Sequence, residues 1–245
     1  MRKHLITAAI LWLVLTVITE FAALNLNIFP LAAAREAKVV DDAFRTLMIL
    51  GAPVFAFVIA VLAYSILRFR ARGEPTEDGP ALFGTNRVAA LWLLVTSALA
   101  VYVIFNPGLS GLAELHWGIE PKADLVVKVE SARWFWKVNY PAYGVTTQKE
   151  IVLPVGKHVR VETNAVDVIH SWWVPAFRLK IDSVPGLTTV LYITPDKIAS
   201  YETDQNMRLQ CAELCGIGHT IMMVPVRVVS QQDFDAWVAK AKASQ

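Results

Sequence analysis

The sequence predicts a membrane-anchored all-β protein, in which N-terminal transmembrane helices precede a small β-sandwich or barrel and a short C-terminal helix. Long uncharged apolar runs fill residues 1–113, which hold nine Lys or Arg and seven acidic residues. Residues 114–245 hold fourteen of each and show the alternation of β-strands. Only 18% of the chain is charged, against roughly 25% in soluble domains. With two cysteines and few glycines and prolines, the composition excludes disordered, collagen-like and disulfide-rich secreted chains.

Two apolar runs predict a transmembrane helical hairpin over residues 35–113. Leu47–Leu67 has 21 residues without a charge, which as a helix can cross a hydrocarbon core of about 30 Å. Val88–Phe105 has 18 uncharged residues, near the lower limit for a span. A soluble protein with one core would need several amphipathic partners to cover these runs, and the sequence offers none.

The first apolar run, residues 5–34, is interrupted only by Glu20 and has two interpretations. The basic start at Arg2 and Lys3 and the small residues Ala32–Ala34 are typical of a signal peptide with its cleavage site. The run exceeds the roughly 7–15 apolar residues of a signal peptide core. We therefore favour a retained first transmembrane helix within residues 1–34.

Basic residues at the ends of the runs predict the orientation in the membrane. They gather before the first run and between the second and third, at Arg2, Lys3, Arg68, Arg70, Arg72 and Arg87. The positive-inside rule places both clusters in the cytoplasm, whether or not the first run is cleaved. We expect a multi-pass protein of the plasma or inner membrane, with residues 114–245 on the extracytoplasmic or periplasmic side.

Period-two alternation predicts β-strands in the second half of the chain. The runs are Leu125–Glu130, Trp134–Asn139, Ile151–Leu153, His158–Thr163, Thr188–Ile193 and Met223–Val229. Turn residues such as Pro154–Gly156 and Pro185–Gly186 separate them, and this spacing favours a Greek-key sandwich or barrel. Ser230 and Asp233 have the spacing of a capping box, which predicts a closing helix with Phe234 and Val238 on its apolar face.

One short stretch contains both cysteines and a set of soft metal ligands. Cys211, Cys215, His219 and Met222 follow one another at intervals of four, four and three residues, and His170 lies 41 residues before Cys211. Thiolate, imidazole and thioether ligands favour copper or zinc over magnesium or calcium. We expect Gly216 and Gly218 to give the backbone freedom that a tight loop needs.

Several kinds of site fit this cluster. A disulfide leaves His170, His219 and Met222 unexplained, whereas a structural zinc fits two Cys and two His but does not use Met. A mononuclear blue-copper site leaves one cysteine superfluous. Two thiolates are both used if they bridge two copper ions. Each ion then takes one His, with Met222 and the backbone carbonyl of Glu213 as weak axial ligands.

The segment Cys211–Met222, CAELCGIGHTIM, resembles the binuclear copper (CuA) loop of cytochrome c oxidase subunit II. The sequence DVIHSWWVP around His170 and the K-x-D-x-x-P-G pattern at Lys180–Gly186 are similar to the family's segment around its first copper histidine. Arg133–Trp136, RWFW, looks like the family's aromatic cluster. The resemblance extends over about residues 67–240 and leaves out the first apolar run.

The resemblance implies a cupredoxin-like domain and the subunit of a haem–copper terminal oxidase that receives electrons from a soluble donor. Cys211 and Cys215 would bridge the coppers, and His170, His219, Met222 and the Glu213 carbonyl would complete the CuA centre. The Glu213 side chain would also reach a magnesium ion at the border with subunit I. Trp134 would be the first electron acceptor.

The partners that the resemblance implies are subunit I, further oxidase subunits, the lipid membrane and a soluble cytochrome c or small copper protein; nucleic acid is not among them. Subunit I would carry the haems and reduce oxygen to water with proton translocation. Two other functions stay open: the copper subunit of a haem-containing nitric oxide reductase, and a membrane-anchored copper delivery or storage protein. The latter would need an exposed Met- or His-rich site, and the chain has only five Met.

Two positions depart from the family pattern. Ala89, three residues before Trp92, stands where the family has a glutamate that admits protons to the catalytic subunit. Leu187 stands where an arginine commonly follows the Pro-Gly pair. The first departure puts the route of proton uptake in doubt, and the second puts contacts with the catalytic subunit in doubt.

Overall fold

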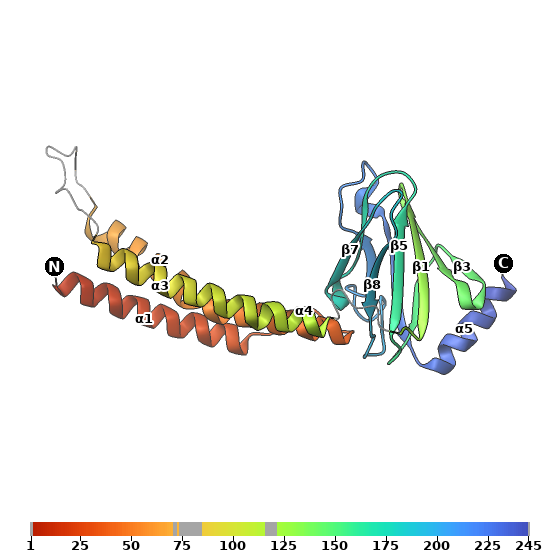
Figure 1. Cartoon of the computed structure of the whole chain (residues 1–245), viewed down its shortest axis with the longest axis horizontal. Coiled ribbons are helices and arrows are strands. Elements are labelled where there is room, and N and C mark those ends of the chain that lie inside the picture. The colour runs from red at the N-terminus through yellow and green to blue at the C-terminus, as the bar shows by residue number, and fades with distance from the viewer. Residues whose placement is uncertain (1, 71–72, 74–84, 116–121, 245) are drawn as a thin grey trace. The chain divides into compact units, whose positions relative to one another are not determined.

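A computed structural model describes residues 2–70, 73, 85–115 and 122–244 of the chain. It divides into a helical unit, Met1–Ile28 with Asp42–Leu112, and a β unit, Phe29–Asp41 with Ala113–Gln245 (Figure 1). Arg72, one of the basic residues used to predict the orientation, lies outside the described residues. The predicted boundaries after residues 34 and 113 stay predictions. Each unit is described by itself.

The helical unit contains the three apolar helices that the sequence predicts. They are α1 (Arg2–Asn25), α2 (Arg35–Arg68, whose first residues belong to the β unit) and α3 (Asn86–Val103), which continues through a kinked turn at Ile104–Leu109 into α4 (Ser110–Glu114). All three are long and apolar enough to cross a membrane. Most of their large apolar side chains are exposed in the isolated chain, as expected for surfaces that face lipid or other subunits.

Specific contacts join α1 to α2. Trp12 Nε1 donates to the Pro53 carbonyl at 2.8 Å, and His4 Nδ1 lies 2.7 Å from the Tyr64 hydroxyl. Arg45 donates to the Leu24 carbonyl at 3.2 Å, near the C-terminal end of α1. Polar contacts of this kind hold helices together in an apolar medium, where no water competes for them. The first apolar run therefore forms a packed helix of the unit.

The β unit is a sandwich of two sheets (Figure 1). One sheet has the order β3-β2-β1-β5-β8, and the other has the order β4-β11-β10-β6-β7, with β9 beside β11. The first sheet consists of β1 (Leu125–Ala132), β2 (Phe135–Tyr140), β3 (Val145–Thr147), β5 (Val159–Ala165) and β8 (Thr189–Ile193). The second consists of β4 (Ile151–Pro154), β6 (His170–Val174), β7 (Leu179–Ser183), β9 (Ala199–Ser200), β10 (Arg208–Cys211) and β11 (Met223–Val229). The predicted sandwich is confirmed.

Alternation along the strands places one face of each in the core. In β5 and β11, buried and partly exposed residues alternate at every position. The largest fully buried side chains fill the space between the sheets: Trp136, Trp172, Tyr140, Phe177 and Phe234. Strands β3, β6, β7, β9 and β10 were not predicted. The alternation signal is absent in β6, His-Ser-Trp-Trp-Val, because four of its five residues are buried.

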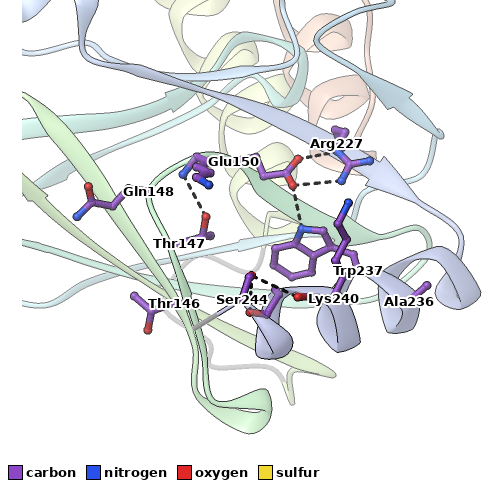
Figure 2. A pocket seen from close by; sticks show the side chains of 11 residues that line it. Thr146, Thr147, Gln148, Glu150, Arg227, Ala236, Trp237, Lys240 and Ser244 are labelled. Atoms are coloured by element: carbon purple, nitrogen blue, oxygen red, sulfur yellow. Dashed lines mark hydrogen bonds and ion pairs between the residues drawn. The ribbon is translucent and has the colours of Figure 1, made fainter.

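Helix α5 (Gln231–Ala243) closes the β unit. Ser230 Oγ accepts from the Asp233 backbone N–H at 3.1 Å, so the predicted cap is confirmed. Phe234 is buried against the sandwich, and Trp237 Nε1 donates to Glu150 Oε1 at 2.8 Å. Figure 2 shows Glu150 between Trp237 and Arg227, whose Nε donates to the same carboxylate at 2.7 Å. These contacts hold α5 against the sandwich, at the edge opposite to β7 (Figure 1).

The connection between α1 and α2 is part of the β unit. Arg178, in the turn between β6 and β7, pairs with Asp41 through Nε at 2.8 Å and Nη2 at 3.1 Å. Its guanidinium also donates to the carbonyls of Leu31 at 3.0 Å, Pro175 at 2.7 Å and Pro30 at 2.5 Å. The ion pair is largely buried, with side-chain exposures of 10% and 16%. One guanidinium therefore ties the connection to the sandwich.

Backbone pairing continues the same contact. Ala33 donates to the Ala176 carbonyl at 2.9 Å and accepts from Asp196 at 3.1 Å. Glu36 accepts from the Thr194 backbone N–H at 3.0 Å. Ala33 and Ala34, part of the predicted small-residue cleavage motif, are 0% and 1% exposed. Small side chains at these positions allow the connection to pack closely on the sandwich.

We expect Arg178→Ala to lower the free energy of unfolding of the β unit by about 3 kcal/mol, because it leaves a buried carboxylate and three carbonyls without their donor. Arg178→Lys should recover only part of this loss, since an ammonium cannot form the two-pronged pair. The measurement is chemical unfolding of the full chain in detergent. Lys137→Ala, which breaks an exposed pair with Glu130, is the control and should change the stability by less than about 1 kcal/mol. Equal effects of the two alanine variants would contradict this role of Arg178.

Candidate metal centre

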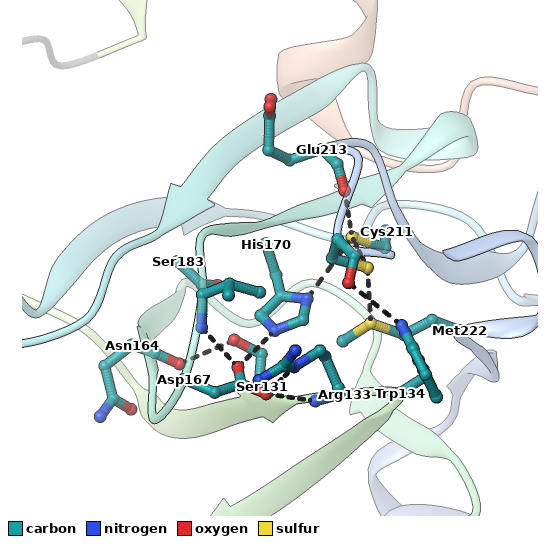
Figure 3. Close-up of polar contacts among 12 residues, drawn as sticks. Ser131, Arg133, Trp134, Asn164, Asp167, His170, Ser183, Cys211, Glu213 and Met222 are labelled. Carbon is teal, nitrogen blue, oxygen red and sulfur yellow. Dashed lines mark hydrogen bonds and ion pairs between the residues drawn. The ribbon is translucent and has the colours of Figure 1, made fainter. Parts of the chain in front are cut away.

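Three paired strands bring the predicted ligands together. His170 is the first residue of β6 and Cys211 the last of β10, and these strands pair with Cys211 opposite Trp172. Met222 directly precedes β11, which pairs with the other side of β10. His170, Cys211 and Met222 thus meet at one end of the second sheet (Figure 3). Cys215 and His219 lie on the connection between β10 and β11.

The donor atoms surround the two sulfurs. Cys211 Sγ lies 3.8 Å from Cys215 Sγ, 3.8 Å from His170 Nδ1 and 3.1 Å from the Glu213 carbonyl oxygen. Cys215 Sγ lies 3.6 Å from His219 Nδ1 and 3.9 Å from Met222 Sδ. Each sulfur therefore has one imidazole and one weaker donor beside it. All six predicted ligands are brought together.

The site is buried and its chemistry is soft. Cys211, Cys215, His170 and Met222 are each at most 6% exposed, and His219 is partly exposed. Among the described residues, His170, Cys211 and Cys215 form a group whose ligand atoms lie within 4.8 Å of one another. Both cysteines are free, and their separation is well beyond the roughly 2.05 Å of a disulfide. The donor set suits copper or zinc, and the thioether favours copper.

Burial keeps the Cys215 thiol protonated in the absence of a metal. It raises the pKa of Cys215 to about 11, helped by a hydrogen bond and the charge of Cys211. A metal ion reverses this preference because it binds the thiolate directly. Metal binding at this site must therefore release protons.

Asp167 orients His170 and was not predicted as a site residue. Its Oδ1 accepts from His170 Nε2 at 2.9 Å, which turns Nδ1 toward Cys211. The carboxylate also accepts from the backbone N–H of Val168 at 2.7 Å and of Arg133 at 2.8 Å. Partial burial raises the pKa of Asp167, but these bonds, led by that of His170, outweigh it and hold the pKa well below its usual range. A carboxylate behind a metal-binding histidine fixes the ring and its tautomer.

Two tryptophans contact the loop through their indole nitrogens. Trp134 is partly exposed and donates to the Cys215 carbonyl at 3.2 Å. Trp136 is fully buried, donates to the Met222 carbonyl at 3.3 Å and packs edge-on against His170. Trp136 therefore belongs to the core, whereas Trp134 joins the protein surface to the backbone of Cys215.

The remaining predicted positions are exposed. The Glu213 side chain is exposed and points away from Cys211, while its carbonyl points toward it (Figure 3). Leu187 is 55% exposed in the β unit. Ala89 is exposed in the first turn of α3, in the helical unit.

The fold and the donor set define a cupredoxin-like protein that has helices long and apolar enough to span a membrane and a group of residues that could hold a soft metal ion. A family model described as cytochrome c oxidase subunit II, periplasmic domain, matches residues 144–229, which include all six predicted ligands. Cytochrome c oxidase subunit 2 of Thermostichus vulcanus is 28% identical over 91% of this chain and 81% of the relative. The probable cytochrome c oxidase subunit 2 of Rickettsia bellii is 31% identical over 79% of this chain and 76% of the relative.

Among solved structures, the periplasmic domain of cytochrome oxidase subunit II of Bradyrhizobium japonicum is 33% identical, with a TM-score of 0.47. The match covers 51% of this chain and 97% of that one. From the sequence relatives and the family model, the chain belongs to the cytochrome c oxidase subunit II family. It is therefore a subunit of a haem–copper oxidase, as the resemblance implied.

We expect Asp167→Ala to weaken copper binding roughly 10- to 100-fold, because His170 loses the group that orients it. Asp167→Asn, whose amide oxygen can still accept from His170, should lose less. The measurement is competition for cuprous ion with a chelator. Glu130→Gln, at an exposed pair with Lys137, is the control, and equal affinity in all variants would contradict the orienting role.

The raised pKa of Cys215 predicts slow alkylation of the copper-free chain at neutral pH. Since only the thiolate reacts, the rate at Cys215 should keep rising to about pH 11, whereas an ordinary cysteine levels off above about 8.5. Peptide mapping after timed exposure to iodoacetamide measures this rate. A plateau near pH 8.5 would show that burial does not hold the proton on Cys215.

Proposed function

We propose that this chain receives electrons from a soluble donor at a binuclear CuA centre and passes them to the catalytic subunit of the oxidase. The observation that carries the proposal is the convergence of two free thiols, two imidazoles, a thioether and a carbonyl in one cluster, in which the three sulfurs and His170 are buried. Zinc uses no thioether, and a single copper would use one thiolate. A pair of coppers uses all six donors.

In this proposal, the thiolates of Cys211 and Cys215 would be shared by the two metals, His170 and His219 would each hold one, and Met222 and the Glu213 carbonyl would be weak further ligands. When bound, the copper pair supplies a one-electron redox couple with its charge spread over two metals and two sulfurs. The chain holds the ligands on β6, β10 and β11, and Asp167 fixes His170. Such rigid support keeps rearrangement on electron transfer small.

Trp134 is the first electron acceptor in this proposal. Its position supports the role: the ring is partly exposed, and its Nε1 bonds to the carbonyl of Cys215 at 3.2 Å. Leu214, Ile217 and Ile221, on the loop between β10 and β11, are 80%, 92% and 73% exposed. Apolar surface of this kind fits contact with other proteins of the electron-transfer chain.

The family and the apolar helices support a proposed organisation in the membrane. We place a first transmembrane helix in residues 1–34, a hairpin in 35–113 and the CuA domain, 114–245, outside the cytoplasm. Subunit I would carry the haems and reduce oxygen to water with proton translocation. In this proposal, the Glu213 carboxylate, which is exposed, would bind magnesium at that subunit border. Donors of two kinds, cytochrome c and a small copper protein, fit a domain without net charge.

The copper content and spectrum of the full chain in detergent test the proposal. We expect two coppers per chain and an electron paramagnetic resonance signal split by two equivalent nuclei. Met222→Leu should keep both coppers, raise the potential and make them less equivalent, because a weak axial ligand tunes a site more than it holds it. Cys215→Ser should abolish the binuclear signal. A single copper in the parent, or equal effects of the two substitutions, would contradict the assignment.

A further inference from the structure

The indole ring of Trp134 lies directly against the backbone of the loop between β10 and β11. A Cβ on Gly216 would lie 3.3 Å from Trp134 Cζ2 and 3.5 Å from its Nε1. A Cβ on Gly218 would lie 2.6 Å from Trp134 Cγ and 2.7 Å from Cε3, and closer still to Cδ2. The ring therefore occupies the space where residue 218 would carry a side chain.

The two glycines are needed for different reasons. Gly216 has φ +114°, a conformation that L-residues rarely adopt, so its backbone requires glycine. Gly218 has φ −92° and ψ 12°, which other residues adopt readily in turns. The expectation that Gly218 supplies backbone freedom is thus wrong. Its conformation does not require glycine, but the ring of Trp134 does.

The ring is held from two further directions. Its Nε1 donates to the Cys215 carbonyl at 3.2 Å. The preceding residue, Arg133, is fixed by Asp167, which accepts from its backbone N–H at 2.8 Å and from its Nε at 3.1 Å. The loop backbone is itself bonded, from His219 N–H to Gly216 and from Ile221 N–H to Gly218, at 3.0 and 3.2 Å. The loop backbone is held by these hydrogen bonds, whereas the ring is partly exposed. We therefore expect a methyl group at position 218 to displace the ring and not the loop.

We propose that Gly218 is a positioning residue for electron uptake, which acts by letting Trp134 lie on the copper loop with its indole bonded to Cys215. This inference rests on the proposed role of Trp134 as first electron acceptor. A methyl group at position 218 pushes the ring outward and breaks the bond to Cys215. The ligands stay in place, because Gly218 contributes no donor atom. The route from the surface to the centre becomes longer.

The test measures electron uptake in the purified oxidase complex, with reduced cytochrome c and a reduced small blue-copper protein as the two donors. The variants are the parent, Gly218→Ala, Trp134→Ala and the double variant. We expect Gly218→Ala to slow pre-steady-state reduction about tenfold or more, since a displacement of about 1 Å is costly in a positioned reaction. Copper content and the optical spectrum should match the parent. In the Trp134→Ala background, Gly218→Ala should have no further effect.

A second readout follows the ring without using activity. The copper-free full chain is labelled with 5-fluorotryptophan, and the ¹⁹F signal of Trp134 is assigned by its loss in Trp134→Phe. In Gly218→Ala, this signal should shift toward that of a solvent-exposed ring, while the other signals stay unchanged. Gly51→Ala, where an added Cβ meets nothing within 4 Å, is the matched control and should leave the Trp134 signal in place.

The outcomes separate the two proposals. Normal uptake in Gly218→Ala together with slow uptake in Trp134→Ala would overturn the role of Gly218 alone. An equal slowing by Gly218→Ala with and without the indole would also overturn it, because the effect would not pass through the ring. Normal uptake in Trp134→Ala would overturn the acceptor role of Trp134, whatever the ¹⁹F signal shows.

Discussion

The pairing of β10 with β6 on one side and β11 on the other is the constraint on which the metal centre depends. It sets Cys211 opposite Trp172, and the backbone N–H of Cys211 donates to Met222 at 3.1 Å. A slip of one residue in either pairing would turn Cys211 to the opposite face of the sheet. The buried rings of Trp136 and Trp172 fill the core beneath the pairing and oppose such a slip. The donor positions are therefore set by the packing of the whole sandwich.

Burial disfavours the charged thiolate at this site, and the same burial makes the site favour soft metal ions over hard ones. Two thiols and an imidazole lie inside the core, where little water can solvate them. Burial raises the pKa of Cys215, so its thiolate form is disfavoured. Only a ligand that binds thiolate strongly can reverse this preference, which favours soft metal ions. Hard cations bind weakly to sulfur and imidazole ligands of this kind.

The fold class and the clustering of the candidate ligands could be predicted from the sequence better than the contacts that support them. Cys211, Cys215, His219 and Met222 lie on one loop, so their spacing alone indicated a site, and alternation indicated strands such as β5 and β11. Strand β6 was missed because burial on both faces removes the alternation. Arg178 pairs with Asp41 across 137 positions, and only the folded topology brings these two residues near each other. Asp167 stands three residues before His170, but its bond to the ring depends on the backbone bend over residues 166–168, for which strand alternation gives no signal.

Contacts of Asp167 and Gly218 connect the ring of Trp134 to the candidate metal centre. Asp167 bonds His170 with one oxygen and Arg133 with the other, so a single carboxylate fixes a ligand and the residue before Trp134. On the opposite side, the ring of Trp134 rests on the loop that carries Cys215. A shift of the ring relative to the centre would therefore break its bond to Cys215 or the bond between Asp167 and Arg133, or would separate the ring from Gly218. If Trp134 is the first electron acceptor, as proposed, this double attachment would keep the distance from its ring to the centre constant.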